Sequence, residues 1–252
     1  GQSTKGQPLV AIINGLGGYG SDTEWDEVTS QITPYAKVCL FDRAGLGKSS
    51  APKPGYSVAS IALHLEGALQ ASGHKEKVIL VGHSFASYPV RMFHHFYPER
   101  VAGIVLVDPM MFGANNDRAN GWRPDTEVYS GQLTQMMNHF KEQWQNPAQA
   151  PENLDYQASY RQIIQASDFG STPYVLLYAK DRDRMNPKAQ GDWPQPRWDR
   201  IVAFYAQAHK QMKSMSEDTR VYFSHLKAHN LHEEDTDWVS EHILNLLNQV
   251  KG

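Results

Sequence analysis

Short apolar runs alternate along the chain with longer segments in which apolar residues recur at helical spacing. The apolar runs have the length of buried strands and are bounded by glycine, proline or charged residues. They lie at 9–13, 37–41, 77–81, 104–107, 174–178 and 220–223. Between them, the segment 57–70 places Ile61, Leu65 and Leu69 on one face of a helix. This alternation predicts an α/β fold, with a mostly parallel sheet and helices on both faces.

The alternation stops between Met110 and about Thr172. This segment is rich in Met, Trp and Tyr and contains two stretches with helical spacing, near 131–144 and 153–165. We therefore expect a helical cap over 110–172, inserted into a core that comprises 1–109 and 173–252. Met and aromatic side chains form adaptable apolar surfaces. They could line an apolar pocket under the cap or only seal the cap to the core, and the pattern leaves both open.

The composition limits the classes of molecule that this protein is expected to bind. The 252 residues include 24 Lys or Arg and 27 Asp or Glu, a net charge of -3, which gives no electrostatic footprint for nucleic acid or an anionic membrane. No apolar run approaches the roughly 20 residues of a membrane span, and no signal peptide is evident. The single cysteine, Cys39, excludes an internal disulfide. We expect a small-molecule partner, while compartment and oligomeric state stay undetermined.

A candidate nucleophile follows the third apolar run. That run leads into Gly82-His83-Ser84-Phe85-Ala86 and then a helical segment. A serine on a strained strand-to-helix turn needs small residues two positions before and after it, and Gly82 and Ala86 meet this requirement. The simpler interpretation is that Ser84 only caps the following helix.

Other motifs compete with this interpretation. Gly15-x-Gly17-x-x-Gly20 follows a strand and matches a dinucleotide-binding fingerprint, with Asp42 near the spacing of a ribose-binding acid. That would indicate an NAD(P)-dependent oxidoreductase, but the chain has no Tyr-x-x-x-Lys pair of the kind that short-chain dehydrogenases use. A phosphate-binding loop ending in Gly47-Lys48-Ser49 would need glycine where Asp42 stands.

The histidines do not indicate a metal site. His94 and His95, or His225, His229 and His232, form loose groups without a matching set of cysteines or carboxylates at ligand spacing. We expect neither a metal nor a cofactor.

A serine-hydrolase interpretation uses three separate loops at once. Ser84 would attack, His229 would take its proton, and Asp183 would orient the imidazole. The backbone N–H groups of Leu16 and Phe85 would bind the oxyanion. Two other acids are open alternatives: Asp181, on the same loop as Asp183, and Asp108, which also ends a strand.

These motifs, in this order, resemble the α/β-hydrolase fold family of esterases and lipases. The resemblance rests on Asn-Gly-Leu-Gly-Gly at 14–18, Asp-Arg-Ala-Gly-Leu-Gly-Lys-Ser at 42–49, the Ser84 motif, Asp183 after a late strand and His229 before a terminal helix. Asp183 fits the family's spacing better than Asp181. The chain departs from the family pattern at Asn14, Ala86 and Lys180, where His, Gly and Gly are common. The family's first strand hairpin has only residues 1–8 to form it, so we expect the hairpin to be short or missing.

The resemblance implies hydrolysis of a carboxylic ester or thioester through an acyl-enzyme, without cofactor or metal. A serine nucleophile argues against dehalogenase and epoxide hydrolase chemistry, which needs a carboxylate in this fold. The cap composition suggests a small apolar substrate. A ligand-binding receptor or carrier on the same scaffold is the alternative, and C–C, peptide and peracid chemistry share the same residues.

Overall fold

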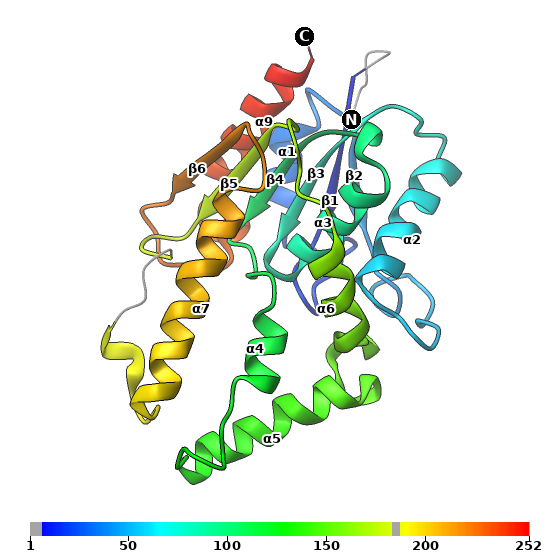
Figure 1. The fold of residues 1–252 in the computed structure, drawn as a ribbon. Helices are drawn as coiled ribbons and strands as arrows, with labels where there is room; N and C mark the ends of the chain where they lie inside the picture. Colours follow the sequence, from blue (N-terminus) through cyan, green and yellow to red (C-terminus); the bar gives the residue numbers. More distant parts are fainter. Residues whose placement is uncertain (1–6, 183–186, 252) are drawn as a thin grey trace.

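A parallel sheet forms the centre of the molecule in the computed structural model, which describes residues 7–182 and 187–251 (Figure 1). Within that part of the chain the strand order is β2-β1-β3-β4-β5-β6, and all five pairings are parallel. The strands are β1 (Leu9–Ile13), β2 (Val38–Phe41), β3 (Val78–His83), β4 (Val101–Val107), β5 (Tyr174–Tyr178) and β6 (Thr219–Phe223). The predicted parallel sheet is confirmed.

Each central strand is apolar on both faces because both faces are covered. In β1, Val10 and Ile12 pack into one hydrophobic cluster, whereas Leu9, Ala11 and Ile13 pack into the other. Successive strand residues point to opposite sides, so a continuous apolar run is typical of a strand between two helical layers. Burying a Val, Leu or Ile side chain in this way contributes about 1.5–3 kcal/mol.

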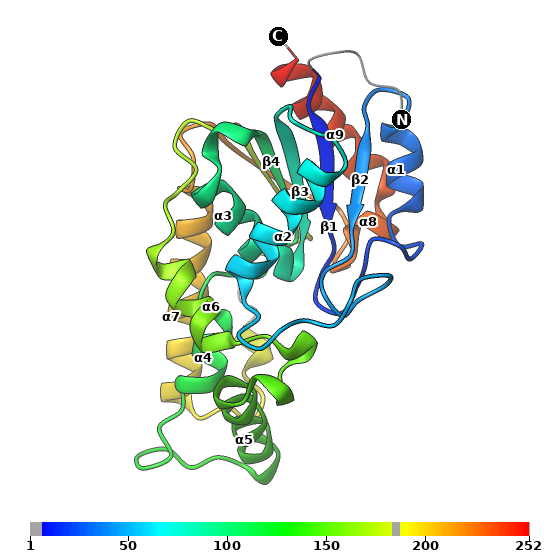
Figure 2. The same ribbon diagram turned by 90° about the vertical axis from the view of Figure 1, so that its right-hand side faces the viewer.

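Helices cover the two faces separately (Figure 2). The helices α1 (Asp26–Ile32), α8 (Leu231–Glu234) and α9 (Thr236–Val250) lie on one face. On the other face lie α2 (Val58–Ala71), α3 (Ser87–Phe96) and the C-terminal half of α7 (Gln195–Lys213). Ser57 caps α2: the Ser60 hydroxyl accepts the Ser57 N–H, and the Ser57 side chain accepts from the first turn. None of the helices in the described part of the chain has both the length and the apolar character that crossing a bilayer requires.

The segment between β4 and β5 forms a helical layer beyond the carboxyl ends of the strands (Figure 1). It contains α4 (Ala114–Asn120), α5 (Gly131–Gln145) and α6 (Tyr156–Gln165). Trp122, Leu133 and Met137 are buried against one another and against further aromatic residues of this layer. Part of its Met and aromatic content therefore fills its own interior. The carboxyl edge that it covers is where open α/β sheets bind ligands.

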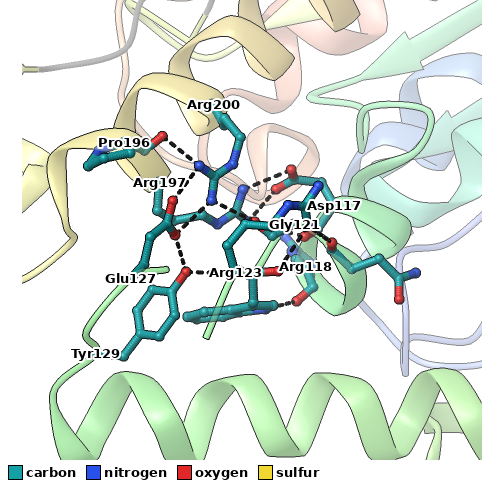
Figure 3. A network of polar contacts seen from close by, with 11 residues as sticks. Asp117, Arg118, Gly121, Arg123, Glu127, Tyr129, Pro196, Arg197 and Arg200 are labelled. Carbon is teal, nitrogen blue, oxygen red and sulfur yellow. Dashed lines mark hydrogen bonds and ion pairs between the residues drawn. The ribbon is translucent and has the colours of Figure 1, made fainter. Parts of the chain in front are cut away.

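The first turns of α7 are joined to this layer by two ion pairs (Figure 3). Arg197 Nη2 lies 2.7 Å from Asp117 Oδ2, and Arg200 Nη1 lies 2.6 Å from Glu127 Oε1. Hydrogen bonds from Arg200 hold the pKa of Glu127 at about 2. Although α7 lies outside the 110–172 span expected for the cap, its N-terminal end is attached to this helical layer.

Candidate active site

Ser84 stands on a sharp turn between β3 and α3. Its φ is +52°, in the left-handed region, and one turn of 3-10 helix at Ser84–Ala86 leads into α3. A Cβ added to Gly82 would lie 3.0 Å from Val90 and 3.2 Å from the Cβ of Ala86. Strand and helix therefore pass each other too closely for a larger residue at position 82, as a nucleophile elbow requires.

The structure places His229 against Ser84. The imidazole is carried by the loop between β6 and α8, and its Nε2 lies 2.9 Å from Ser84 Oγ. This is the distance over which a base takes a proton from a hydroxyl. Two residues 145 positions apart in sequence, both singled out from the motifs, are thus in direct contact.

Asp108 is the carboxylate on the other side of the imidazole. Its Oδ2 lies 2.5 Å from His229 Nδ1, and the residue is 1 % exposed. The backbone N–H of Ala179 donates to Oδ1 at 3.2 Å, and Arg182 Nε lies 3.4 Å from the same oxygen. With Nδ1–H donating to Asp108, Nε2 is left to accept the hydroxyl proton of Ser84.

The sheet register explains why Asp108 reaches this position. His83 of β3 is paired with Val107 of β4, so Ser84 and Asp108 are the residues that leave two neighbouring strands at the same level. Asp108 also has a positive φ, +38°. Backbone strain of this kind is concentrated at functional sites.

Asp183, the acid expected to orient His229, lies outside the described residues. Its neighbour Asp181 is described and pairs loosely with Lys227, with 3.7 Å between Oδ2 and Nζ. Within the described part of the chain, the carboxylate in contact with His229 is that of Asp108. In the sequence, Asp108 is marked as a candidate acid by its position directly after a buried strand. Several other residues occupy such a position, so this observation alone does not single it out.

The glycine-rich loop after β1 lies against the Ser84 turn. The N–H of Gly18 donates to the carbonyl of Gly15 at 3.1 Å, and Gly17 has a φ of +83°, as the third residue of a type II turn requires. A Cβ on Gly15 would lie 2.8 Å from His83 Nδ1 and 3.4 Å from the Cβ of Ser84. The loop that carries Leu16 is therefore beside the candidate nucleophile, and Phe85 directly follows it.

Two further histidines, His83 and His232, are buried beside the candidate site. His83 Nε2 lies 3.1 Å from the carbonyl of His229 and donates to it, which ties the loop of His229 to the Ser84 turn. Burial, with smaller contributions from His232 and His229, lowers the pKa of His83 to about 3. Burial likewise lowers the pKa of His232 to about 4, and this ring stacks on Trp25 at 4.4 Å. Both rings are therefore neutral at neutral pH.

Comparison with known proteins agrees with this architecture. The sequence model of the family described as alpha/beta hydrolase fold matches residues 8–178, more than half of the chain. The chain belongs to the α/β-hydrolase fold family.

Relatives of this α/β hydrolase match over part of their length. A putative carbamate hydrolase RutD from Klebsiella pneumoniae is 33 % identical over 104 residues, which are 41 % of this chain and 38 % of that protein. The abhydrolase domain-containing protein abhd-5.2 of Caenorhabditis elegans is 29 % identical over 106 residues, 41 % of this chain and 23 % of the relative. The chain thus aligns with only about a quarter to two fifths of these relatives.

Solved α/β-hydrolase structures match nearly the whole chain at low identity. An esterase from Thermogutta terrifontis has a TM-score of 0.58 at 17 % identity, over 96 % of this chain and 90 % of that one. An epoxide hydrolase from Bacillus megaterium has a TM-score of 0.60 at 12 % identity, over 98 % and 94 %. At these identities the likeness concerns the fold. In this fold the residues follow the chain order serine, acid, histidine, which Ser84, Asp108 and His229 also keep.

Proposed function

We propose that this α/β hydrolase is a serine hydrolase that cleaves carboxylic esters, or thioesters, through an acyl-enzyme. The observation that carries the proposal is the continuous contact from Asp108 through His229 to Ser84, with distances of 2.5 and 2.9 Å. A serine hydroxyl becomes an effective nucleophile when a base takes its proton and a third group orients that base. Asp108 takes the orienting role that the motifs had assigned to Asp183.

The reaction would proceed in two halves. Ser84 Oγ attacks the ester carbonyl while its proton passes to His229 Nε2, and Asp108 stabilises the resulting imidazolium. The N–H groups of Leu16 and Phe85 would donate to the oxyanion of the tetrahedral intermediate. The alcohol then leaves with the proton from His229. Water, activated by the same imidazole, releases the acid and restores Ser84.

The nucleophile separates this chain from some of its structural neighbours. Epoxide hydrolases of this fold form an ester through a carboxylate, and the elbow here carries a hydroxyl. Acyl transfer from an ester, thioester or carbamate needs a hydroxyl nucleophile, a base and oxyanion donors, which the groups around Ser84 would supply. A small apolar acyl group is part of the proposal, supported by the Met and aromatic content of the 110–172 segment.

Covalent labelling tests the proposal directly. The wild-type protein should react with a fluorophosphonate probe, and Ser84→Ala and His229→Ala should abolish both labelling and ester hydrolysis with unchanged far-UV circular dichroism. His225→Ala, at an exposed histidine on the same loop, is the matched control and should retain full activity. A wild-type protein that binds apolar ligands without being labelled would favour the carrier alternative.

Substrate choice is measured with p-nitrophenyl esters of increasing acyl length. We expect kcat/KM to be highest for short to medium apolar acyl groups. Preference for charged acyl groups would contradict the apolar part of the proposal and leave the serine mechanism intact.

A further inference from the structure

A buried arginine binds backbone carbonyls of the glycine-rich loop that follows β1. Arg43, two residues after β2, is fully buried. Its Nη1 donates to the carbonyl of Asn14 at 2.5 Å, and its Nη2 donates to the carbonyls of Gly15 at 2.6 Å and Gly18 at 3.2 Å. One cation thus binds three carbonyls of the loop that carries Leu16.

The counter-ion of Arg43 comes from the helical layer. Glu152 lies between α5 and α6, and its side chain is 2 % exposed. It accepts from Arg43 Nε at 2.8 Å and Nη2 at 2.7 Å, and its Oε1 also accepts the N–H of Gly17 at 2.8 Å. A charge-assisted, two-point contact of this kind fixes orientation as well as distance.

The backbone around Glu152 is held in an unusual conformation. Glu152 has a φ of +57° and Asn153 a φ of +53°, so two consecutive non-glycine residues occupy the left-handed region. Such conformations persist only where the surroundings enforce them. The contacts with Arg43 and Gly17 supply that enforcement.

Peptide geometry links these contacts to the N–H of Leu16. The carbonyl of Gly15 and the N–H of Leu16 belong to the same planar trans peptide and point in opposite directions. Because Arg43 binds the Gly15 carbonyl, the Leu16 N–H is directed away from the guanidinium. Glu152 fixes the next N–H, that of Gly17, so the peptides on either side of Leu16 are both anchored.

We propose that Arg43 and Glu152 are positioning residues for the oxyanion donor at Leu16, and that the helical layer controls through Glu152 whether this donor is correctly aimed. The inference rests on the proposed function. The loop contains glycines at 15, 17 and 18 and has little rigidity of its own. A preorganised donor stabilises the oxyanion, which is absent from the bound ester and develops in the transition state leading to the tetrahedral intermediate. A misdirected Leu16 N–H therefore lowers kcat more than it changes KM.

Glu152→Gln tests this role because it keeps the shape of the side chain and removes its charge. We expect kcat for a p-nitrophenyl ester to fall about 10- to 100-fold, with KM changed less than about threefold. Affinity for a trifluoromethyl ketone, which forms an oxyanion on Ser84, should fall by the same factor. A purely structural role would not weaken the transition-state analogue selectively.

A matched ion pair elsewhere provides the control. Arg100 pairs with buried Glu66 at 3.1 Å and also donates to the backbone carbonyls of His74, Lys75 and Glu76, away from the site. Glu66→Gln should destabilise the protein without changing kcat or analogue affinity. If Glu152→Gln folds poorly, the same change is made in an Asn153→Gly background, where glycine suits the left-handed conformation.

The outcomes separate the two proposals. Wild-type kcat and analogue affinity in Glu152→Gln would overturn the positioning role while Ser84 labelling still supports the hydrolase. An equal loss of kcat in Glu66→Gln would also overturn it, because general destabilisation would then explain both variants. Failure of the wild-type protein to label or hydrolyse would remove the proposed function together with this inference.

Discussion

At the residue scale, the candidate active site depends on two strand-terminal residues in left-handed conformations. Ser84 and Asp108 leave adjacent, register-matched strands with φ values of +52° and +38°. Each of these conformations costs on the order of 1–3 kcal/mol, which the surrounding packing must supply. The conformations turn both side chains from the sheet toward His229.

The acid assignment can be checked by comparing three asparagine variants. Asp108→Asn should lower kcat by about 10⁴-fold, because an amide does not hold the imidazole in the tautomer that accepts the Ser84 proton. Asp181→Asn should leave kcat within about twofold of wild type. A greater loss for Asp183→Asn than for Asp108→Asn would return the role to Asp183.

A second residue-scale prediction concerns the close approach of Gly15 to the elbow. Gly15→Ala would bring a methyl group within 2.8 Å of His83 and 3.4 Å of Ser84, so the loop must move. We expect kcat to fall at least about tenfold, as for a displaced oxyanion donor. Gly67→Ala, at an exposed position of α2 with open space around it, should keep kcat and stabilise the helix by about 1 kcal/mol. Unchanged kcat in Gly15→Ala would contradict the tight contact.

At the element scale, α7 joins the helical layer to the core. Its C-terminal half packs on the sheet through Ala208 and Met212, and its N-terminal turns bind Asp117 and Glu127 (Figure 3). Arg197 is 2 % exposed, so its charge depends on Asp117 for compensation.

Removing one partner of the buried Arg197–Asp117 pair should therefore lower the free energy of unfolding substantially. Asp117→Asn is expected to lower the free energy of unfolding by about 3 kcal/mol, because the Arg197 charge loses its buried counter-ion. Asp218→Asn breaks a pair whose side chains are more than one third exposed and should cost less than about 1 kcal/mol. Urea denaturation followed by circular dichroism measures both, and equal costs would contradict the importance of burial at Asp117.

The elements were predictable wherever the hydrophobic pattern was regular. All six apolar runs form strands, and the terminal helix expected after His229 occupies Thr236–Val250. The short helices α4 and α8 were not anticipated, because four to seven residues carry too little periodicity. Motif chemistry pointed to Ser84 and His229, which the structure places in contact. Asp108 contacts His229 through strand register, and Glu152 reaches Arg43 across 109 positions, neither of which a single sequence encodes locally.

At the scale of the whole molecule, buried neutral histidines couple stability to pH. The pKa of His83 is lowered to about 3 and that of His232 to about 4, below the roughly 6.5 of the unfolded chain. The unfolded chain then binds more protons than the folded one, so stability falls as the pH drops below about 6.5.

This coupling predicts how steeply the free energy of unfolding changes with pH. Each ring should contribute a loss of about 1.4 kcal/mol per pH unit between about pH 6 and pH 4. His232→Phe keeps the stacking on Trp25 and should remove about half of that slope in urea titrations. His225→Phe, at a side chain that is 79 % exposed, should leave the slope unchanged. A His232→Phe slope equal to that of wild type would contradict the assignment.

The strand order β2-β1-β3-β4-β5-β6 also has a consequence for biosynthesis. From β3 onward each new strand adds to the outer edge of those already made, so a growing polypeptide can extend its sheet as it leaves the ribosome. His229, the proposed base, however, lies in the loop after β6 and is synthesised later. Under the proposed mechanism, a nascent chain would carry Ser84 without its proton acceptor, and would not hydrolyse esters until the loop of His229 has folded.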